Sequence, residues 1–154
     1  MIERYRDGSA FEAVAAAGSM SGSGGVIVID DSTCMVQFAL RTAEFYRHES
    51  CGKCTPCREG TNWTVKMLER IDEGEGTPMD LDILEQVQGN IMGNCLCVLG
   101  DSMAMPIGSM IKKLRPEFEA HIEQAREENL RTTVVPDPLP LRGVNAGFAG
   151  AYHH

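Results

Sequence analysis

The sequence has 154 residues and contains no hydrophobic run long enough to cross a bilayer. A membrane-spanning helix needs about 20 consecutive apolar residues, and the longest candidate, residues 26–30 (VIVID), has only the length of a strand. Basic residues are also scarce, since 14 Lys and Arg stand against 22 Asp and Glu, a net charge of −8. We therefore expect no direct membrane insertion and no nucleic-acid partner.

A secretory signal is missing from the first residues, MIERYRDGSA. They lack the basic segment followed by an apolar segment that such a signal requires, so we expect a cytoplasmic protein. Thiols stay reduced in the cytosol, and six cysteines in such a chain indicate metal binding or redox chemistry rather than disulfides. No phosphate-binding loop, Ser/His/Asp arrangement or pair of acid–base carboxylates stands out. The sequence therefore predicts no catalytic residue.

The pattern along the chain predicts three parts. Residues 1–25 read as a linker or as the remnant of a truncated preceding domain, because residues 18–25 (GSMSGSGG) are flexible by composition. Residues 26–130 are expected to form a strand followed by a helical domain. The β-branched run at 26–29 predicts one buried strand, with partners that are missing or supplied by another chain. Residues 131–154 lack periodicity and are predicted to be a flexible or disordered tail.

Four stretches place apolar residues at helical spacing, at about 31–48, 61–73, 77–91 and 106–125, the last with either a kink or a fresh start at Pro116. Thr77, Pro78 and Asp80 resemble a capping box at the start of the third stretch. The pattern predicts a mainly α fold: a small four-helix bundle with one short N-terminal strand and a disordered C-terminal tail. Trp63 is expected in the core at a helix–helix contact, and Cys34 is expected to be a small core residue.

The most informative segment is ESCGKCTPCREG, in which Cys51, Cys54 and Cys57 form a CxxCxxC motif. Three thiolates at this spacing can each bind a different iron of one 4Fe-4S cluster. A fourth ligand must come from farther along the chain, where Cys95 and Cys97 are both candidates. A structural zinc site with four thiolates is the alternative, although it usually has two well-separated CxxC pairs.

Charged residues near this motif allow two interpretations each. His48 is either a proton-coupled group or extra ligand, or a histidine stabilised at a helix C-terminus by the helix dipole, and we favour the second. Lys53 and Arg58 either raise the reduction potential of a cluster by offsetting its charge or form a solvated surface pair.

Three segments resemble a known family: GSGGVIVIDDSTCMV, FYRHESCGKCTPCREGT and CVLGDSMAMPIGSMIKKLRPEFEAHI. They are similar to the C-terminal iron-sulfur-binding region of the flavoprotein F subunit of NADH:quinone oxidoreductase (complex I), a module also found in NAD-linked hydrogenases and formate dehydrogenases. The resemblance extends over about residues 17–125. It implies a helical bundle that holds one 4Fe-4S cluster, which accepts electrons from a neighbouring flavin.

The resemblance also implies a ligand set. Cys51, Cys54 and Cys57 match the first three ligands of the family. Cys97 matches the fourth, because the family's cysteine there is followed by a short apolar pair, glycine and often aspartate, as in CVLGD here. Cys95 then stands at a position that is usually not cysteine, and we expect it to be a neighbouring or alternative thiol.

Part of the family's pattern has no counterpart in this sequence. The FMN and NADH sites of the family lie in a large N-terminal domain with a glycine-rich loop, and SGSGG is too short and precedes its strand. We therefore expect FMN and NAD only on a partner or a missing domain, and no activity toward NADH from this chain alone. The expected partners are a flavin/NADH-binding subunit or domain and further iron-sulfur subunits of a respiratory or hydrogenase-type complex. Such a complex would hold the chain at the cytoplasmic face of the membrane.

Overall fold

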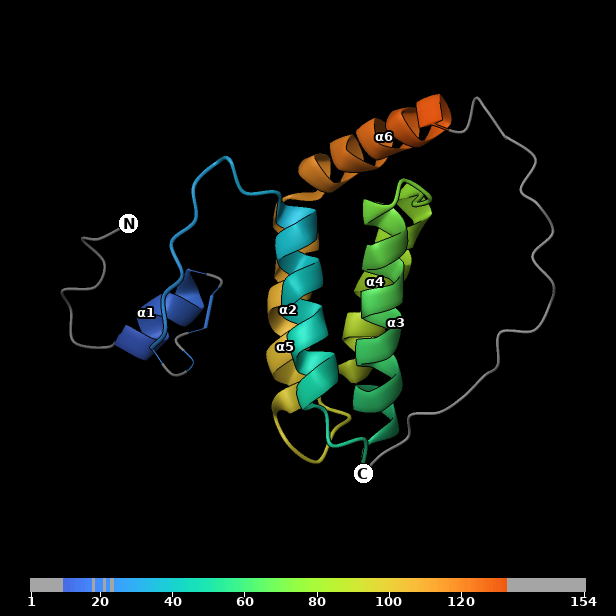
Figure 1. Cartoon of the computed structure of the whole chain (residues 1–154). Helices are drawn as coiled ribbons and strands as arrows, with labels where there is room; N and C mark the ends of the chain where they lie inside the picture. The colour runs from blue at the N-terminus through green and yellow to red at the C-terminus, as the bar shows by residue number, and fades with distance from the viewer. Residues whose placement is uncertain (1–9, 18, 21, 23, 133–154) are drawn as a thin grey trace, which may run out of the picture. The chain divides into compact units, whose positions relative to one another are not determined.

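The computed structural model describes residues 10–17, 19–20, 22 and 24–132, and this part of the chain is mainly helical (Figure 1). Its helices are α1 (Ala10–Ala16), α2 (Met35–Glu49), α3 (Thr55–Asp72), α4 (Pro78–Ile91), α5 (Leu99–Lys113) and α6 (Arg115–Thr132). The predicted mainly α class is confirmed. No helix among these residues is long and apolar enough to cross a membrane.

The chain divides into two compact units, residues 1–33 and 34–154. The first unit contains α1 and an extended segment in which Val26, Ile27 and Val28 are at least three-quarters exposed. The strand predicted at residues 26–29 is therefore wrong for the described residues, none of which is in a strand. β-branched residues favour extended backbone, but a strand forms only where a second strand accepts its hydrogen bonds.

The predicted domain limits at residues 25 and 130 stay predictions. The predicted disordered tail lies outside the described residues from residue 133 onward.

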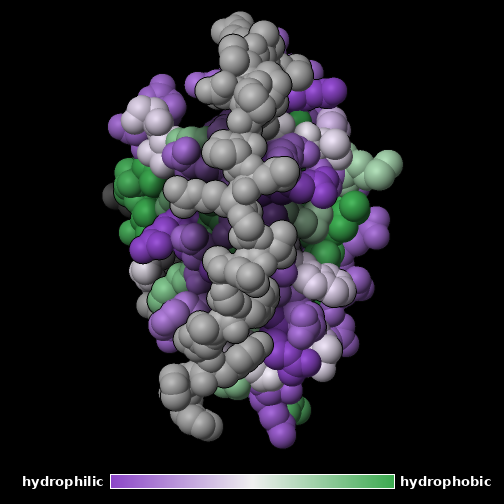
Figure 2. All heavy atoms as spheres, turned by 45° about the vertical axis from the view of Figure 1, so that its right-hand side comes forward, coloured by the Kyte–Doolittle hydropathy of each residue, from purple (hydrophilic) through white to green (hydrophobic). Residues whose placement is uncertain are grey.

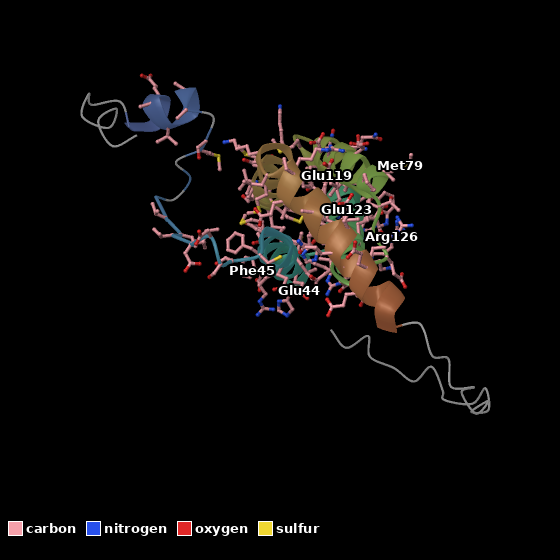
Figure 3. All side chains as sticks on the ribbon, turned by 90° about the horizontal axis from the view of Figure 1, so that it is seen from above. Glu44, Phe45, Met79, Glu119, Glu123 and Arg126 are labelled. Atoms are coloured by element: carbon pink, nitrogen blue, oxygen red, sulfur yellow. The ribbon has the colours of Figure 1, made fainter. Side chains whose placement is uncertain are left out.

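The second unit is built around α2, α3, α4 and α5. α2 packs against α3 and α5, and α4 packs against the same two helices, so the four surround a common core. α6 contacts α2, α3 and α5, and it lies across one end of them (Figures 1 and 3). In Figure 3, Glu119, Glu123 and Arg126 mark the course of α6 over the other helices. The fully buried core side chains include Val36, Val65, Leu68, Ile71, Leu81, Leu84, Met103, Ile107, Ile111 and Phe118.

Two helices begin earlier in the sequence than the periodicity predicts. α3 begins at Thr55 rather than near residue 61, and α5 begins at Leu99 rather than near Pro106. Pro106 lies inside α5, where burial of Met103 and Ile107 on either side of it offsets the weak helix propensity of proline. Of the two alternatives at Pro116, the fresh start is the one observed, because α6 begins at Arg115.

The predicted capping box at the start of α4 is confirmed. The Asp80 carboxylate accepts hydrogen bonds from the Thr77 backbone N–H at 2.6 Å and from Thr77 Oγ1 at 2.9 Å. Arg70 Nη2 of α3 donates to both carboxylate oxygens at 2.6 Å. Burial by itself raises the pKa of Asp80, but the bonds from Thr77 and the Arg70 charge outweigh it and lower that pKa from its ordinary 3.8. This carboxylate therefore ties α3 to the start of α4.

Gly74, in the turn after α3, brings that turn against α6. Its φ is +78°, a backbone conformation that favours glycine. A Cβ at this position would overlap the backbone carbonyl of Ala125 in α6. The absence of a side chain therefore allows close contact between two backbones.

Trp63 is 55% exposed, so the prediction that it lies in the core is wrong. The buried face of α3 passes through Cys57, Thr61, Thr64 and Leu68, and Trp63 falls beside that stripe. It lines a shallow groove of about 400 Å³ between α3 and α4, together with Pro56, Val87 and Ile91. On the face drawn in Figure 2, hydrophilic residues predominate among the coloured residues, and hydrophobic ones form small separate patches.

Candidate iron-sulfur site

Two loops and the first turn of α3 bring five of the six cysteines to one end of the helical unit, the end opposite α6 (Figure 1). Residues 50–54 join α2 to α3, and residues 92–98 join α4 to α5. The loops are in contact, since the Leu96 backbone N–H donates to Cys54 Sγ at 3.3 Å. Asp101 Oδ1 accepts from the Gly93 backbone N–H at 2.9 Å and fixes the second loop to the first turn of α5.

The CxxCxxC motif crosses the start of α3. Cys54 is the N-cap residue of this helix and Cys57 lies in its first turn, whereas Cys51 lies in the loop. Cys51 is exposed, Cys54 is half-buried and Cys57 is buried. Because the early start of α3 includes Cys57, the motif lies at the positive end of the helix dipole.

Hydrogen bonds shape the loop around these thiols. Gly52 has φ +74°, and its carbonyl oxygen accepts from Arg58 Nη1 at 2.8 Å. Ser50 Oγ lies 3.3 Å from Cys57 Sγ and 3.4 Å from the Gly52 backbone N–H. The Ser50 hydroxyl thus faces Cys57, and the Leu96 backbone N–H faces Cys54. Hydrogen-bond donors at such positions stabilise thiolate ligands and tune the reduction potential of a cluster.

The two downstream cysteines differ in their surroundings. Cys95 Sγ is half-buried, lies 3.8 Å from the Ile91 carbonyl oxygen and packs against the hydrophobic core. A Cβ at Gly100 would come within 2.8 Å of it. Burial, followed by the proximity of Cys57, Cys54 and Asp101, raises the pKa of the Cys95 thiol.

Cys97 is exposed and comes directly before Val98, the N-cap of α5. The structure thus brings both candidates for a fourth ligand to the end where the motif lies, with Cys95 close to Cys54 and Cys57.

The donor set of several thiols suits an iron-sulfur cluster. Among the described residues, no three His, Cys, Asp or Glu side chains lie close enough together to hold one ion. A cubane cluster is larger, and each thiolate binds a different iron, so its ligands lie farther apart than those of a tetrahedral zinc. Several thiols, two helix N-termini and local hydrogen-bond donors at one end of the unit suit such a cluster.

Two of the charged residues near the motif make specific contacts. Arg58 bridges the Gly52 carbonyl oxygen and the Glu59 carboxylate, the latter at 2.9 Å. His48 lies in the last turn of α2, as expected for a helix C-terminus, and its ring contacts the neighbouring Glu49 at 3.0 Å.

Two residues that shape the site had no role assigned to them from the sequence, Ser50 beside Cys57 and Asp101 beside Gly93. Serine and aspartate are common in turns. Their bonding partners here become visible only in the fold.

A helical domain that gathers five cysteines at one end, with α6 across the other, has the thiol donors of an iron-sulfur-binding region. A family model described as the NADH-ubiquinone oxidoreductase-F iron-sulfur binding region matches residues 37–121. The chain belongs to this family.

Its relatives include subunits of NADH-quinone and NADH-ubiquinone oxidoreductases. One of them, the second F subunit of the NADH-quinone oxidoreductases of Rhizobium meliloti, is 58% identical over 119 residues, which cover 77% of this chain and 28% of that protein. The mitochondrial NADH-ubiquinone oxidoreductase 51 kDa subunit of Neurospora crassa is 41% identical over 119 residues, covering 77% and 24%. This chain therefore spans about a quarter of the length of the curated relatives it matches.

A solved structure of an NAD⁺-reducing [NiFe]-hydrogenase in the H₂-reduced state is also similar, with 30% sequence identity and a TM-score of 0.59. The match covers 72% of this chain and 21% of that chain. NADH-quinone oxidoreductase F subunits thus contain a region of similar sequence, and an NAD⁺-reducing hydrogenase contains a region of similar fold.

Proposed function

We propose that this chain is the electron-transfer module of an NADH dehydrogenase of the F-subunit type, relaying single electrons from a flavin through one 4Fe-4S cluster. The contact between Leu96 and Cys54 carries the proposal, because it joins the loop of the CxxCxxC motif to the loop of the downstream cysteines. When bound, the cluster supplies one-electron redox chemistry. The residues of this chain hold it, orient it and set its potential.

The proposed ligands are Cys51, Cys54, Cys57 and Cys97. Cys97 is preferred to Cys95 as the fourth because it is exposed at the start of α5. Cys95, by contrast, is half-buried and packs against the core. Cys95 is then a thiol beside the cluster that fills space between α4 and the first turn of α5.

FMN and NAD are proposed to bind to a partner or to another domain, in line with the short part of each relative that this chain matches. Further iron-sulfur subunits of a respiratory or hydrogenase-type complex would accept the electrons. In such a complex the chain would lie at the cytoplasmic face of the membrane without entering it.

Metal and sulfide analysis tests the cluster. The chain is purified anaerobically, and iron, acid-labile sulfide, zinc and flavin are quantified per chain. We expect iron and sulfide in equal amounts, close to four of each, with a spectrum that bleaches on addition of a strong chemical reductant. Stoichiometric zinc without sulfide would instead establish the structural zinc site.

The separation of flavin and cluster gives a second test. Hydride from NADH delivers two electrons at once, so a one-electron cluster needs a flavin to divide them. We expect the purified chain neither to bind nor to oxidise NADH and to reduce a dye only after a flavin-bearing partner is added. Dye reduction by NADH and the chain alone, free of flavoprotein contaminants, would contradict the proposal.

A further inference from the structure

A second group of reactive side chains lies at the α6 end, away from the cluster loops. Cys34 directly precedes α2, Asp72 is the last residue of α3, and His121 lies in the middle of α6. Cys34 Sγ is 3.5 Å from His121 Nδ1, and His121 Nε2 is 3.3 Å from Asp72 Oδ1. One imidazole ring therefore lies between a thiol and a carboxylate.

The geometry assigns a role to each nitrogen of His121. If Nδ1 accepts the thiol proton, the neutral ring carries its own proton on Nε2, next to the Asp72 carboxylate. Nε2 is buried and makes no hydrogen bond, so Asp72, with Oδ1 at 3.3 Å, acts on the ring as a nearby negative charge. A base beside a thiol, with a carboxylate behind the base, is the general arrangement of an activated cysteine nucleophile.

The surroundings of Cys34 allow it to react. Its side chain makes no hydrogen bond to the start of α2, and its thiol is half-buried. The His121 and Asp72 side chains keep 21% and 29% of their surface exposed. Glu117, one turn before His121, accepts from the Met35 backbone N–H at 3.1 Å and is engaged there. Cys34 packs against the hydrophobic core but is only half-buried, so the residue keeps part of its surface open to solvent.

From these contacts we propose that Cys34 is a modification site that exchanges with low-molecular-weight disulfides, with His121 as proton acceptor and Asp72 as a positioning residue. The Cys34 proton passes to His121 Nδ1, and Cys34 Sγ attacks one sulfur of the small disulfide. The disulfide bond breaks, a mixed disulfide forms on Cys34, and the departing thiolate takes the proton from His121. Cys34 is oxidised and half of the small disulfide is reduced to a thiol, so electrons and protons balance.

The test uses the full chain with its metal site loaded, treated with oxidised glutathione over a range of pH. Adducts are located by peptide mass mapping, which separates Cys34 from the five cysteines at the opposite end. We expect the adduct on Cys34, to be lost in Cys34→Ser and to be reversed by an excess of a small thiol. An adduct confined to other cysteines overturns the proposal.

Variants separate the roles of the three residues. His121→Gln should slow the reaction at Cys34 by about tenfold or more and change its pH profile, because the proton acceptor is lost. Asp72→Asn should slow it less, since the base remains. Glu117→Gln is the matched control on the same helix, and it should react at least as fast as the parent. A parent-like rate in a folded His121→Gln overturns the assignment.

A comparison without substitutions guards against unfolded variants. The rate at Cys34 is measured in the folded parent and in the same chain in urea. We expect the folded chain to react several-fold faster, because only folding brings His121 to Cys34 across 87 positions of sequence. Equal or slower reaction in the folded chain overturns the proposal. Since Cys34 lies outside the cluster loops, the iron and sulfide content reports separately on the proposed function.

Discussion

The two ends of the helical unit are organised by different interactions. At the α6 end, backbone and side chains contact one another directly: Gly74 against Ala125, Arg70 with Asp80, and His121 between Cys34 and Asp72. At the other end the loops carry exposed residues, among them Cys51, Cys97, Leu96 and Val98. The polypeptide alone thus builds one end, and we expect the bound cluster to order the other.

The largest expected effect separates the two candidates for the fourth ligand. Cys97→Ala should abolish the cluster or convert it to a form with less iron, because one iron loses its thiolate. Cys95→Ala removes a packed thiol from the same loop and should leave the cluster largely intact. Iron and sulfide content, with the spectrum of the reduced protein, measure both. Loss of the cluster in Cys95→Ala but not in Cys97→Ala would reverse the assignment.

Removing the cluster tests the contrast between the ends. A group that binds only the folded state contributes its binding free energy to stability, so the cluster-free chain should melt at a lower temperature. Hydrogen exchange should increase at residues 49–59 and 92–98 and change little in α6 and the turn at Gly74. Uniform exchange changes along the whole unit would show that its ends are not independent.

A glycine substitution tests the α6 end. Gly74→Ala should lower the free energy of unfolding by about 2 kcal/mol or more, since alanine is strained at this φ and its Cβ meets the backbone of α6. Gly89→Ala is the matched control, because a Cβ there meets nothing within 4 Å. As alanine favours helix, this control should be neutral or stabilising by up to about 1 kcal/mol. Urea unfolding of both variants measures the difference.

The smallest expected effect concerns the carboxylate that caps α4. Asp80→Asn should lower the free energy of unfolding by about 1–2 kcal/mol at neutral pH. The side chain that accepts hydrogen bonds from Thr77 and Arg70 then carries no negative charge. The pKa of Asp80 is lowered in the folded chain. The stability that the Asp80 carboxylate contributes is therefore fully present above the ordinary pKa of 3.8, and it is lost as pH falls through the lowered pKa of the folded chain. The difference between parent and variant should shrink in acid, and a difference independent of pH would exclude this origin.

Much of the helical domain follows from local pattern. The apolar spacing at residues 77–91 predicts a helix there, and Leu81, Leu84, Val87 and Ile91 are all buried in α4. The cap at Thr77 and Asp80 is equally local, because both residues belong to one turn. Helix starts were less predictable. α3 begins at Thr55 and α5 at Leu99, where polar, glycine or cysteine residues interrupt the apolar period but the packed neighbours favour helix.

The candidate site divides in the same way. The CxxCxxC motif indicates the first three cysteines by spacing alone, because one cluster needs thiolates at that separation. The contacts around these cysteines are made by residues outside the motif. Ser50 lies beside Cys57, and Leu96 of the other loop lies beside Cys54. The residues predicted as ligands lie at the end where the two loops meet, and their assignment as ligands stays a prediction.

The sequence by itself determined the features that depend on residues a few positions apart. These are the helix faces, the cap of α4 and the cysteine motif. The tertiary structure alone decided which distant residues meet. It placed Trp63 on the surface, left residues 26–29 without strand partners, packed Cys95 against the core and brought His121 to Cys34. The physical reason is that a helix repeats every 3.6 residues, so its faces are set by residues close together in the sequence. Packing between helices depends instead on the shapes of all the surfaces that meet.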